Sequence, residues 1–398
     1  MDRTKTRRVQ IGRVPVGGGA PIAVQSMTTT DTRDPDATVA QILALEAAGV
    51  EIARVAVPDR TAAAALPAIK ARIHVPLVAD IHFDYRLALA ALEGGVDKLR
   101  LNPGNIGSED RVRTVAREAK ARGVPIRVGA NVGSLSKEML RKYGDPCAAA
   151  LVDSALDEIR ILEDLDFHDI VVSVKASDVE MALDAYTSIS EQMPYPLHVG
   201  ITEAGTTWAG TVKSAVGLGA ILSRGIGDTI RISLATDPVE EVKAGFEVLK
   251  ALGLRMRGPI LVACPSCGRA DVDIVALAQE VERRLAAYTV PVKVAVMGCA
   301  VNGPGEARVA DLGVACGRGM GLIFKRGRIV ASLPEAELLE GLMKEVEVVV
   351  REKQAEAVDS AVLAPAGRPA VRSAPGQHGT RAAGHHVIES GGGGNAES

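Results

Sequence analysis

The sequence has few aromatic residues and no long apolar run. Phe, Trp and Tyr make up 3% of the 398 residues, which argues against stacking platforms for single-stranded nucleic acid. Its apolar runs are only of strand length, so we expect no membrane span. The basic segment 1–10 lacks the apolar stretch of a secretory signal. A formal net charge of −3 gives no overall basic balance for nucleic acid. These absences favour a soluble cytoplasmic protein, and any function that depends on charge must be local.

Cysteine is also scarce. Five cysteines in a chain of this size do not read as a disulfide framework, and in the cytosol a cluster of them indicates metal or redox chemistry. The Cys-x3-Cys-x2-Cys loop of a radical-type barrel is absent. A Gly-rich phosphate turn is missing after the first strand, where residues 25–30 read Gln-Ser-Met-Thr-Thr-Thr. That absence disfavours a doubly wound open sheet.

Short apolar strands alternate with Ala-, Leu- and Glu-rich helical stretches as far as residue 252. Eight such units predict an α/β fold with an N-terminal (β/α)8 TIM-type barrel over residues 1–252. The expected strands are Ile22–Met27, Ile52–Val57, Leu77–His82, Lys98–Asn102, Ile126–Val132, Ile170–Lys175, Leu197–Thr202 and Thr229–Leu234.

A second unit follows the linker Gly253–Gly258. We expect a small α/β domain over residues 259–353, with strands Ile260–Ala263, Val292–Val296 and Leu322–Phe324 and helices near Val272–Tyr288 and Glu335–Arg351. From 354 to 398 the chain is rich in Ala, Gly, Pro and Ser. This composition predicts a disordered tail, since it cannot bury enough apolar surface.

Charged and polar residues recur at the ends of the expected barrel strands. Spacing of two places each pair on one strand face, and barrel enzymes build their sites at the carboxyl ends of the strands. Unpaired cations in an interior are costly, and arginine forks suit phosphate oxygens, so we infer a small, highly anionic ligand such as a diphosphate. The pairs are Asp80 and His82, Arg100 and Asn102, Ser173 and Lys175, and Arg231 and Ser233; Arg54, Arg127, Asn131, His198 and Glu203 lie in or just after other strands.

Acid–base chemistry has four candidates in this set: Asp80, His82, His198 and Glu203. A lone histidine at such a position is more often a hydrogen-bonded structural residue. Glu203 follows Thr202 at the mouth of the seventh expected strand. A carboxyl group there could exchange a proton with a substrate that excludes water.

Three cysteines form the second constellation. Cys264 and Cys267 are a Cys-x2-Cys pair at a strand end, and Cys299 lies in a Gly-rich turn that continues as Asn-Gly-Pro-Gly-Glu over residues 302–306. Three thiolates fit three irons of a cubane cluster, with Glu306 as the nearest carboxylate for the fourth. A structural zinc site with Cys316 as fourth thiol is the alternative, and spacing alone leaves both open. Cys147 is expected to be structural.

Four segments together resemble the 4-hydroxy-3-methylbut-2-en-1-yl diphosphate synthase family, in its bacterial two-domain form. They are Val24–Met27, Lys98–Asn105, Cys264–Arg269 and Asn302–Glu306, and the resemblance runs in unbroken order from about residue 8 to 350. The tail lies outside it.

The resemblance implies a [4Fe-4S] cluster on Cys264, Cys267, Cys299 and Glu306, with flavodoxin or ferredoxin as electron donor. It also implies the two-electron reductive ring opening and dehydration of 2-C-methyl-D-erythritol 2,4-cyclodiphosphate, in the non-mevalonate route to isoprenoids. By position, the resemblance assigns the diphosphate to Arg54, Arg100, Arg127, Lys175, Arg231 and Ser233, and the rest of the pocket to Asp80, His82, Asn102, Asn131, His198 and Glu203.

A non-redox barrel transferase or aldolase with a structural zinc domain is the competing hypothesis. The order of the expected elements, like the family resemblance, also predicts a head-to-tail homodimer. The helix after the eighth strand returns the chain to the face opposite the barrel mouth, so the cluster of one chain would serve the barrel of its partner.

Overall fold

The computed structural model describes residues 3–102, 106, 108–267, 270, 272–299, 305 and 309–363. The chain divides into two compact units, Met1–Pro259 and Ile260–Ser398. Within the described part of the chain, no helix is long and apolar enough to cross a membrane.

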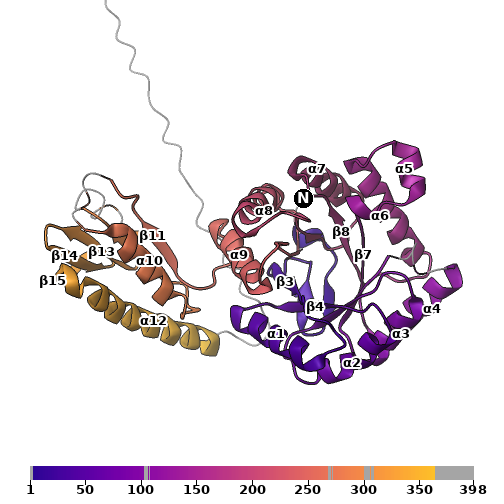
Figure 1. The fold of residues 1–398 in the computed structure, drawn as a ribbon, viewed down its shortest axis with the longest axis horizontal. Coiled ribbons are helices and arrows are strands. Elements are labelled where there is room, and N and C mark those ends of the chain that lie inside the picture. Colours follow the sequence, from indigo (N-terminus) through magenta and orange to yellow (C-terminus); the bar gives the residue numbers. More distant parts are fainter. Residues whose placement is uncertain are drawn as a thin grey trace, which may run out of the picture. The chain divides into compact units, whose positions relative to one another are not determined.

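The first unit is built on an eight-stranded parallel sheet with the order β8-β7-β6-β5-β4-β3-β10-β9. A parallel bridge between Val172 and Leu197 joins the two ends of this order, so the sheet curves into a barrel, with helices around it (Figure 1). The predicted fold class is confirmed. The strands are β3 (Ala23–Met27), β4 (Ile52–Ala56), β5 (Leu77–Asp80), β6 (Lys98–Arg100), β7 (Ile126–Asn131), β8 (Ile170–Lys175), β9 (His198–Val199) and β10 (Thr229–Ile230).

The helices of this unit begin and end at clear local signals. Asp34 accepts a hydrogen bond from the Ala37 amide at the start of α1, and Gly49 ends that helix with a φ of 102°, the left-handed conformation that glycine adopts without cost. Aspartates cap α2, α3, α7 and α9 in the same way. The helices are α1 (Pro35–Ala48), α2 (Arg60–Lys70), α3 (Tyr85–Glu93), α4 (Glu109–Arg122), α5 (Lys137–Tyr143), α6 (Ala148–Glu163), α7 (Val179–Gln192), α8 (Thr207–Leu222) and α9 (Pro238–Ala251).

A β-hairpin, β1 (Val9–Ile11) and β2 (Val14–Val16), precedes the barrel and was not foreseen. Its apolar side chains cluster with those of Ala23, Ile52 and Val78 from the amino-terminal halves of the barrel strands. The hairpin therefore closes the end of the barrel opposite the carboxyl ends of the strands, where barrel enzymes hold their sites.

Several barrel strands are shorter than expected. β5 ends at Asp80 and β6 at Arg100, so His82 and Asn102 lie just beyond the strands. β10 ends at Ile230, which leaves Arg231 and Ser233 in the loop that follows. These side chains still lie at the carboxyl ends of the strands, but loops rather than the ladder hold several of them.

The second unit contains a five-stranded sheet with the order β11-β12-β13-β14-β15. The first three strands are parallel and the last two antiparallel. Helices α10 (Ile274–Leu285) and α12 (Leu338–Leu363) contribute to its apolar core. The strands are β11 (Ile260–Ala263), β12 (Lys293–Met297), β13 (Leu312–Gly317), β14 (Met320–Lys325) and β15 (Arg328–Pro334).

Two of these strands, β13 and β15, were missed. Two glycines, Gly313 and Gly317, weaken the strand pattern of β13. β15 is largely exposed along its length and shows little apolar alternation. Tertiary pairing, not local pattern, decides such strands.

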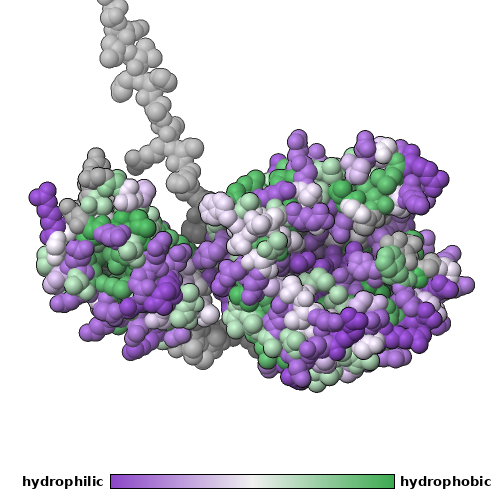
Figure 2. Space-filling model, in the orientation of Figure 1, coloured by the Kyte–Doolittle hydropathy of each residue, from purple (hydrophilic) through white to green (hydrophobic). Residues whose placement is uncertain are grey.

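The helix α12 runs to Leu363, beyond the expected start of the tail at residue 354. The Ala-rich composition of this stretch suggested disorder, yet alanine is also the best helix former. The rest of the predicted tail, 364–398, lies outside the described residues. On the face shown in Figure 2, hydrophilic residues cover much of each unit and the apolar patches are smaller, as expected when the apolar residues form the cores.

Candidate active site

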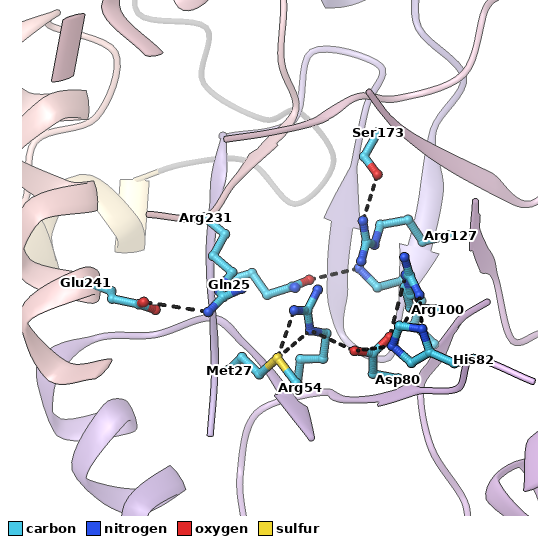
Figure 3. A network of polar contacts seen from close by, with 11 residues as sticks. Gln25, Met27, Arg54, Asp80, His82, Arg100, Arg127, Ser173, Arg231 and Glu241 are labelled. Atoms are coloured by element: carbon cyan, nitrogen blue, oxygen red, sulfur yellow. Dashed lines mark hydrogen bonds and ion pairs between the residues drawn. The ribbon is translucent and has the colours of Figure 1, made fainter. Parts of the chain in front are cut away.

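Asp80 is the hub of a polar cluster at the carboxyl ends of β4, β5 and β6. Its Oδ1 lies 3.5 Å from Arg100 Nε, and its Oδ2 lies 3.9 Å from Arg54 Nε and 3.5 Å from His82 Nε2 (Figure 3). Burial alone would raise the pKa of this carboxyl, but Arg54, His82 and Arg100 together hold it well below its usual value. Asp80 is therefore ionised at neutral pH and orients the cations around it.

Arg54 faces Met27 as well as Asp80. Its Nη2 and Nε lie 2.7 and 3.0 Å from the Met27 Sδ. A thioether is a weak acceptor and carries no charge, so Asp80 is the main counter-charge to Arg54. Burial, and the nearby Arg231 and Arg100, lower the pKa of Arg54 to about 10 despite the opposing effect of Asp80. The guanidinium is still charged at neutral pH and can receive an anion.

Further cations lie deeper in the barrel. Arg127 donates through Nη1 to Ser173 Oγ at 2.7 Å, while its buried Nε has no hydrogen-bond partner among the described residues. Lys98 is fully buried, and its Nζ donates to Gln25 Oε1 at 3.1 Å. Burial and neighbouring arginines lower the pKa values of Lys98 and Lys175 well below normal. Lys98 was overlooked, although its spacing of two from Arg100 places both on one strand face.

Among the described residues of this region, basic side chains outnumber acidic ones two to one. The cations are Arg54, Lys98, Arg100, Arg127, Lys175 and Arg231; the carboxylates are Asp80, Glu158 and Glu241. Such an excess of buried positive charge is unfavourable unless an anion binds there. The arrangement thus suits a small ligand with several negative charges.

Two of the three carboxylates, Glu158 and Glu241, come from helices and were not foreseen. Glu241 of α9 accepts hydrogen bonds from Ser26 Oγ and the Leu234 amide, both at 3.0 Å. Its Oε1 lies 3.5 Å from Arg231 Nη2. Glu158 of α6 accepts a hydrogen bond from the Gly129 amide at 2.7 Å. Each carboxylate joins a helix to the carboxyl end of a barrel strand.

Glu203 lies after β9, in the loop 200–206, and is itself exposed. Its φ is 50°, a left-handed conformation that is strained for a residue other than glycine and that clusters at functional sites. The structure gives it no hydrogen bond or ion pair among the described residues.

His198 begins β9, within the expected seventh strand, and is fully buried. Its Nδ1 lies 2.6 Å from Thr229 Oγ1. Burial and nearby cations keep the pKa of His198 well below normal. The ring is therefore neutral at pH 7. Asn102, Asn131 and Ser233 are half-buried near the strand ends.

Three thiols of the second unit lie just beyond the ends of two adjacent parallel strands. Cys264 and Cys267 follow β11, and Cys299 follows β12. The Gly298 amide donates to Cys264 Sγ at 3.1 Å, a contact that stabilises a thiolate. Among the described residues, no group of three or more His, Cys, Asp or Glu side chains is arranged to hold a metal. Glu306 lies outside those residues.

The other two cysteines have different surroundings. Cys316 is buried in β13 within the apolar core of the second unit, and burial raises the pKa of its thiol to about 11. Cys147 precedes α6 at its amino-terminal cap position. All five cysteines are free of disulfides.

A parallel barrel with excess buried cations at its strand ends, followed by a unit with free thiols at its strand ends, defines a two-domain α/β enzyme for a small anionic substrate. A family model described as GcpE TIM-barrel domain matches residues 6–246, and one described as GcpE protein C-terminal domain matches 260–348. The chain belongs to the GcpE family. This confirms the family resemblance seen in the sequence.

Curated relatives cover nearly the whole chain. One from Geobacillus thermodenitrificans is 59% identical over 352 residues, which are 88% of this chain and 94% of the relative. One from Bacillus mycoides is 57% identical over 354 residues, which are 89% of this chain and 97% of the relative. Both are named 4-hydroxy-3-methylbut-2-en-1-yl diphosphate synthase (flavodoxin). Among solved structures, a Yersinia pestis dihydropteroate synthase has a TM-score of 0.45 and 10% identity, covering 62% of this chain and 97% of that one.

Proposed function

We propose that this chain catalyses the reductive ring opening and dehydration of 2-C-methyl-D-erythritol 2,4-cyclodiphosphate to 4-hydroxy-3-methylbut-2-enyl diphosphate. The observation that carries the proposal is the excess of cations over carboxylates around the ends of the barrel strands. A cyclic diphosphate supplies the missing negative charge and oxygens that arginine forks bind. The names of the curated relatives support the same reaction.

The barrel residues divide into binding and proton-transfer roles. Arg54, Arg100, Arg127, Lys175, Arg231 and Ser233 bind the diphosphate, and Asp80, His82, Asn102, Asn131 and His198 complete the pocket. Glu203 has the catalytic proton role. Its strained backbone and exposed position allow the carboxyl to meet a bound substrate. The reaction opens a ring and releases an oxygen as water, so a proton must be delivered where the C–O bond breaks.

The cofactor is a [4Fe-4S] cluster, held by Cys264, Cys267, Cys299 and Glu306. Bound there, it would supply electrons singly and an iron that acts as a Lewis acid. The three thiols follow two adjacent parallel strands, and the Gly298 amide already donates to one of them. Cys316 packs in the apolar core of the second unit and is not proposed as a ligand. The substrate pocket thus belongs to residues 1–252, the cluster to 259–353, and residues 354–398 have no assigned role.

Reduced flavodoxin, which the relatives' names include, is the proposed electron donor, with ferredoxin as the alternative. We place the enzyme in the cytoplasm, because five unpaired cysteines suit a reducing compartment.

The active form is a head-to-tail homodimer. α9 leads the chain away from the barrel mouth, and its fourteen residues cover about 21 Å at 1.5 Å each. Arg255 then donates to the Ile22 carbonyl at 2.8 Å and pairs with Glu51, just before β3 and β4. The chain therefore leaves the barrel at the end opposite its mouth. A cluster domain from a second copy can reach that mouth, and twofold symmetry serves both sites.

The test is anaerobic purification followed by assay with the cyclodiphosphate and reduced flavodoxin. Brown, iron-containing protein that forms the linear diphosphate is the expected result. Colourless, zinc-containing protein without this activity would instead favour the non-redox barrel enzyme with a structural zinc domain.

A further inference from the structure

Glu158 is a buried carboxyl outside the group of residues assigned above to substrate or cluster. It lies on the face of α6 that packs against the barrel, with 4% of its surface exposed. Its Oε2 accepts a hydrogen bond from the Gly129 amide at 2.7 Å, and the Asn102 side chain is close enough to help lower the pKa of the carboxyl. Gly129 lies in β7 and Asn102 follows β6, so one side chain joins the carboxyl ends of two neighbouring strands.

Both strands carry residues of the anion pocket. Gly129 pairs with Ser173 across the sheet, and Ser173 Oγ accepts the Arg127 guanidinium at 2.7 Å. Gly129 has a φ of 147°, and an added Cβ would collide with the Ser173 carbonyl, so β7 and β8 approach closely at this point. On the other side, Asn102 is two residues from Arg100. A shift of the Glu158 carboxyl would thus move pocket groups on both strands.

Packing alone does not account for a carboxyl here. The structure shows no ion pair to Glu158 among the described residues, although Arg100 and Arg127 attract it from a greater distance. Burial dominates and raises the pKa of Glu158 to about 7. An apolar side chain of similar size would avoid this desolvation cost. What it could not do is accept the hydrogen bond from the Gly129 amide or attract the Asn102 side chain.

We propose that Glu158 is a positioning residue of the anion pocket: its carboxyl tethers the Gly129 backbone and the Asn102 side chain, and so holds the ends of β6 and β7 in the geometry that binds the diphosphate. This inference rests on the proposed function, because it takes the cyclodiphosphate as ligand.

The test is calorimetric titration of the cyclodiphosphate into the anaerobic full-length holoenzyme, without an electron donor. Glu158→Leu should weaken binding at least tenfold, because leucine fills the space without accepting a hydrogen bond. Glu158→Gln keeps both contacts and should bind within about threefold of the unaltered protein. Asp157→Leu changes the exposed neighbour on α6 and should have no effect.

Glu158→Asp covers the case in which the leucine variant does not fold. It keeps the charge but is one methylene too short to reach both partners, so binding should weaken here too. A double variant, Glu158→Leu with Asn102→Ala, should also be measured. Its fold-loss of affinity for the cyclodiphosphate should be smaller than the product of the fold-losses of the two single variants, since one residue acts through the other.

Unchanged binding in folded Glu158→Leu or in Glu158→Asp would overturn the inference. Equal losses of affinity in Glu158→Gln and Glu158→Leu would also overturn it, since the glutamine amide can still make the contacts of the carboxyl. If the unaltered protein itself fails to bind the cyclodiphosphate, the proposed function fails, which is a distinct outcome.

Discussion

Arg231 Nη2 lies 3.5 Å from Glu241 Oε1, and both side chains are largely buried. Arg231 comes from the loop after β10, while Glu241 comes from α9 and also accepts hydrogen bonds from Ser26 and the Leu234 amide. The helix carboxylate therefore fixes the loop that carries one of the proposed diphosphate ligands (Figure 3).

Replacing Glu241 with leucine should lower both stability and substrate affinity. The change leaves the Ser26 hydroxyl and the Leu234 amide without an acceptor, which costs roughly 1–3 kcal/mol for each group. Affinity for the cyclodiphosphate should fall roughly tenfold as Arg231 loses its orientation. Thermal unfolding and calorimetric titration measure the two effects. Glu240→Leu, at the neighbouring position whose side chain is 43% exposed, is the matched control, and equal behaviour of the two variants would refute this role.

Glu203→Gln should slow turnover without loss of iron or substrate affinity. The amide keeps the shape of the side chain but cannot deliver a proton, so kcat should fall by roughly 10²-fold or more. Steady-state kinetics with reduced flavodoxin, together with iron analysis, make the measurement. A kcat near that of the unaltered enzyme would remove Glu203 from the mechanism.

Cys264→Ser, Cys267→Ser and Cys299→Ser should each abolish cluster binding and activity, since an alkoxide is a poor substitute for a thiolate. Iron content and visible absorption of anaerobically purified protein report the outcome. Cys147→Ser and Cys316→Ser are the controls and should retain iron. If Cys316→Ser loses its iron while Glu306→Ala stays fully active, the proposed fourth ligand is wrong.

Stability should depend on pH through Glu158. Its pKa rises from 4.5 to about 7 on folding, so the folded state binds this proton more tightly than the unfolded state. The resulting stability is fully present below about pH 4.5 and is lost as pH rises through 7. Relative to Glu158→Gln, the free energy of unfolding of the unaltered protein should fall by up to roughly 3 kcal/mol as the pH rises from 4.5 through 7. Chemical denaturation at pH 5 and pH 8 tests this, and a constant difference between the two proteins would contradict it.

Two inactive variants should restore part of the activity when mixed. A Cys267→Ser chain provides an intact barrel and a Glu203→Gln chain an intact cluster domain. In a head-to-tail dimer of the two, one site combines both intact parts. The assay follows activity after subunit exchange is verified with differently tagged chains. Confirmed exchange without any return of activity would mean that each site lies within a single chain.

The sequence alone was enough to predict the barrel, and the proposed anion pocket and cluster site also come from sequence patterns. Each rests on short-range patterns: strand-length apolar runs in series, pairs of polar or charged residues spaced by two near strand ends, and a Cys-x2-Cys pair followed by a Gly-rich turn. Such patterns can be recognised in the sequence because the residues that form them lie within a few positions of one another.

Only the tertiary structure revealed the roles of Glu158 and Glu241. In the sequence each is one more acidic residue of an amphipathic helix, where a glutamate is usually solvated. Their partners lie far along the chain, with Gly129 at 29 residues from Glu158 and Ser26 at 215 from Glu241. Packing of α6 and α9 against the barrel decides that these two carboxyls are buried at the strand ends, because burial and hydrogen-bond partners depend on which surfaces meet, and the sequence pattern of a single helix does not specify that.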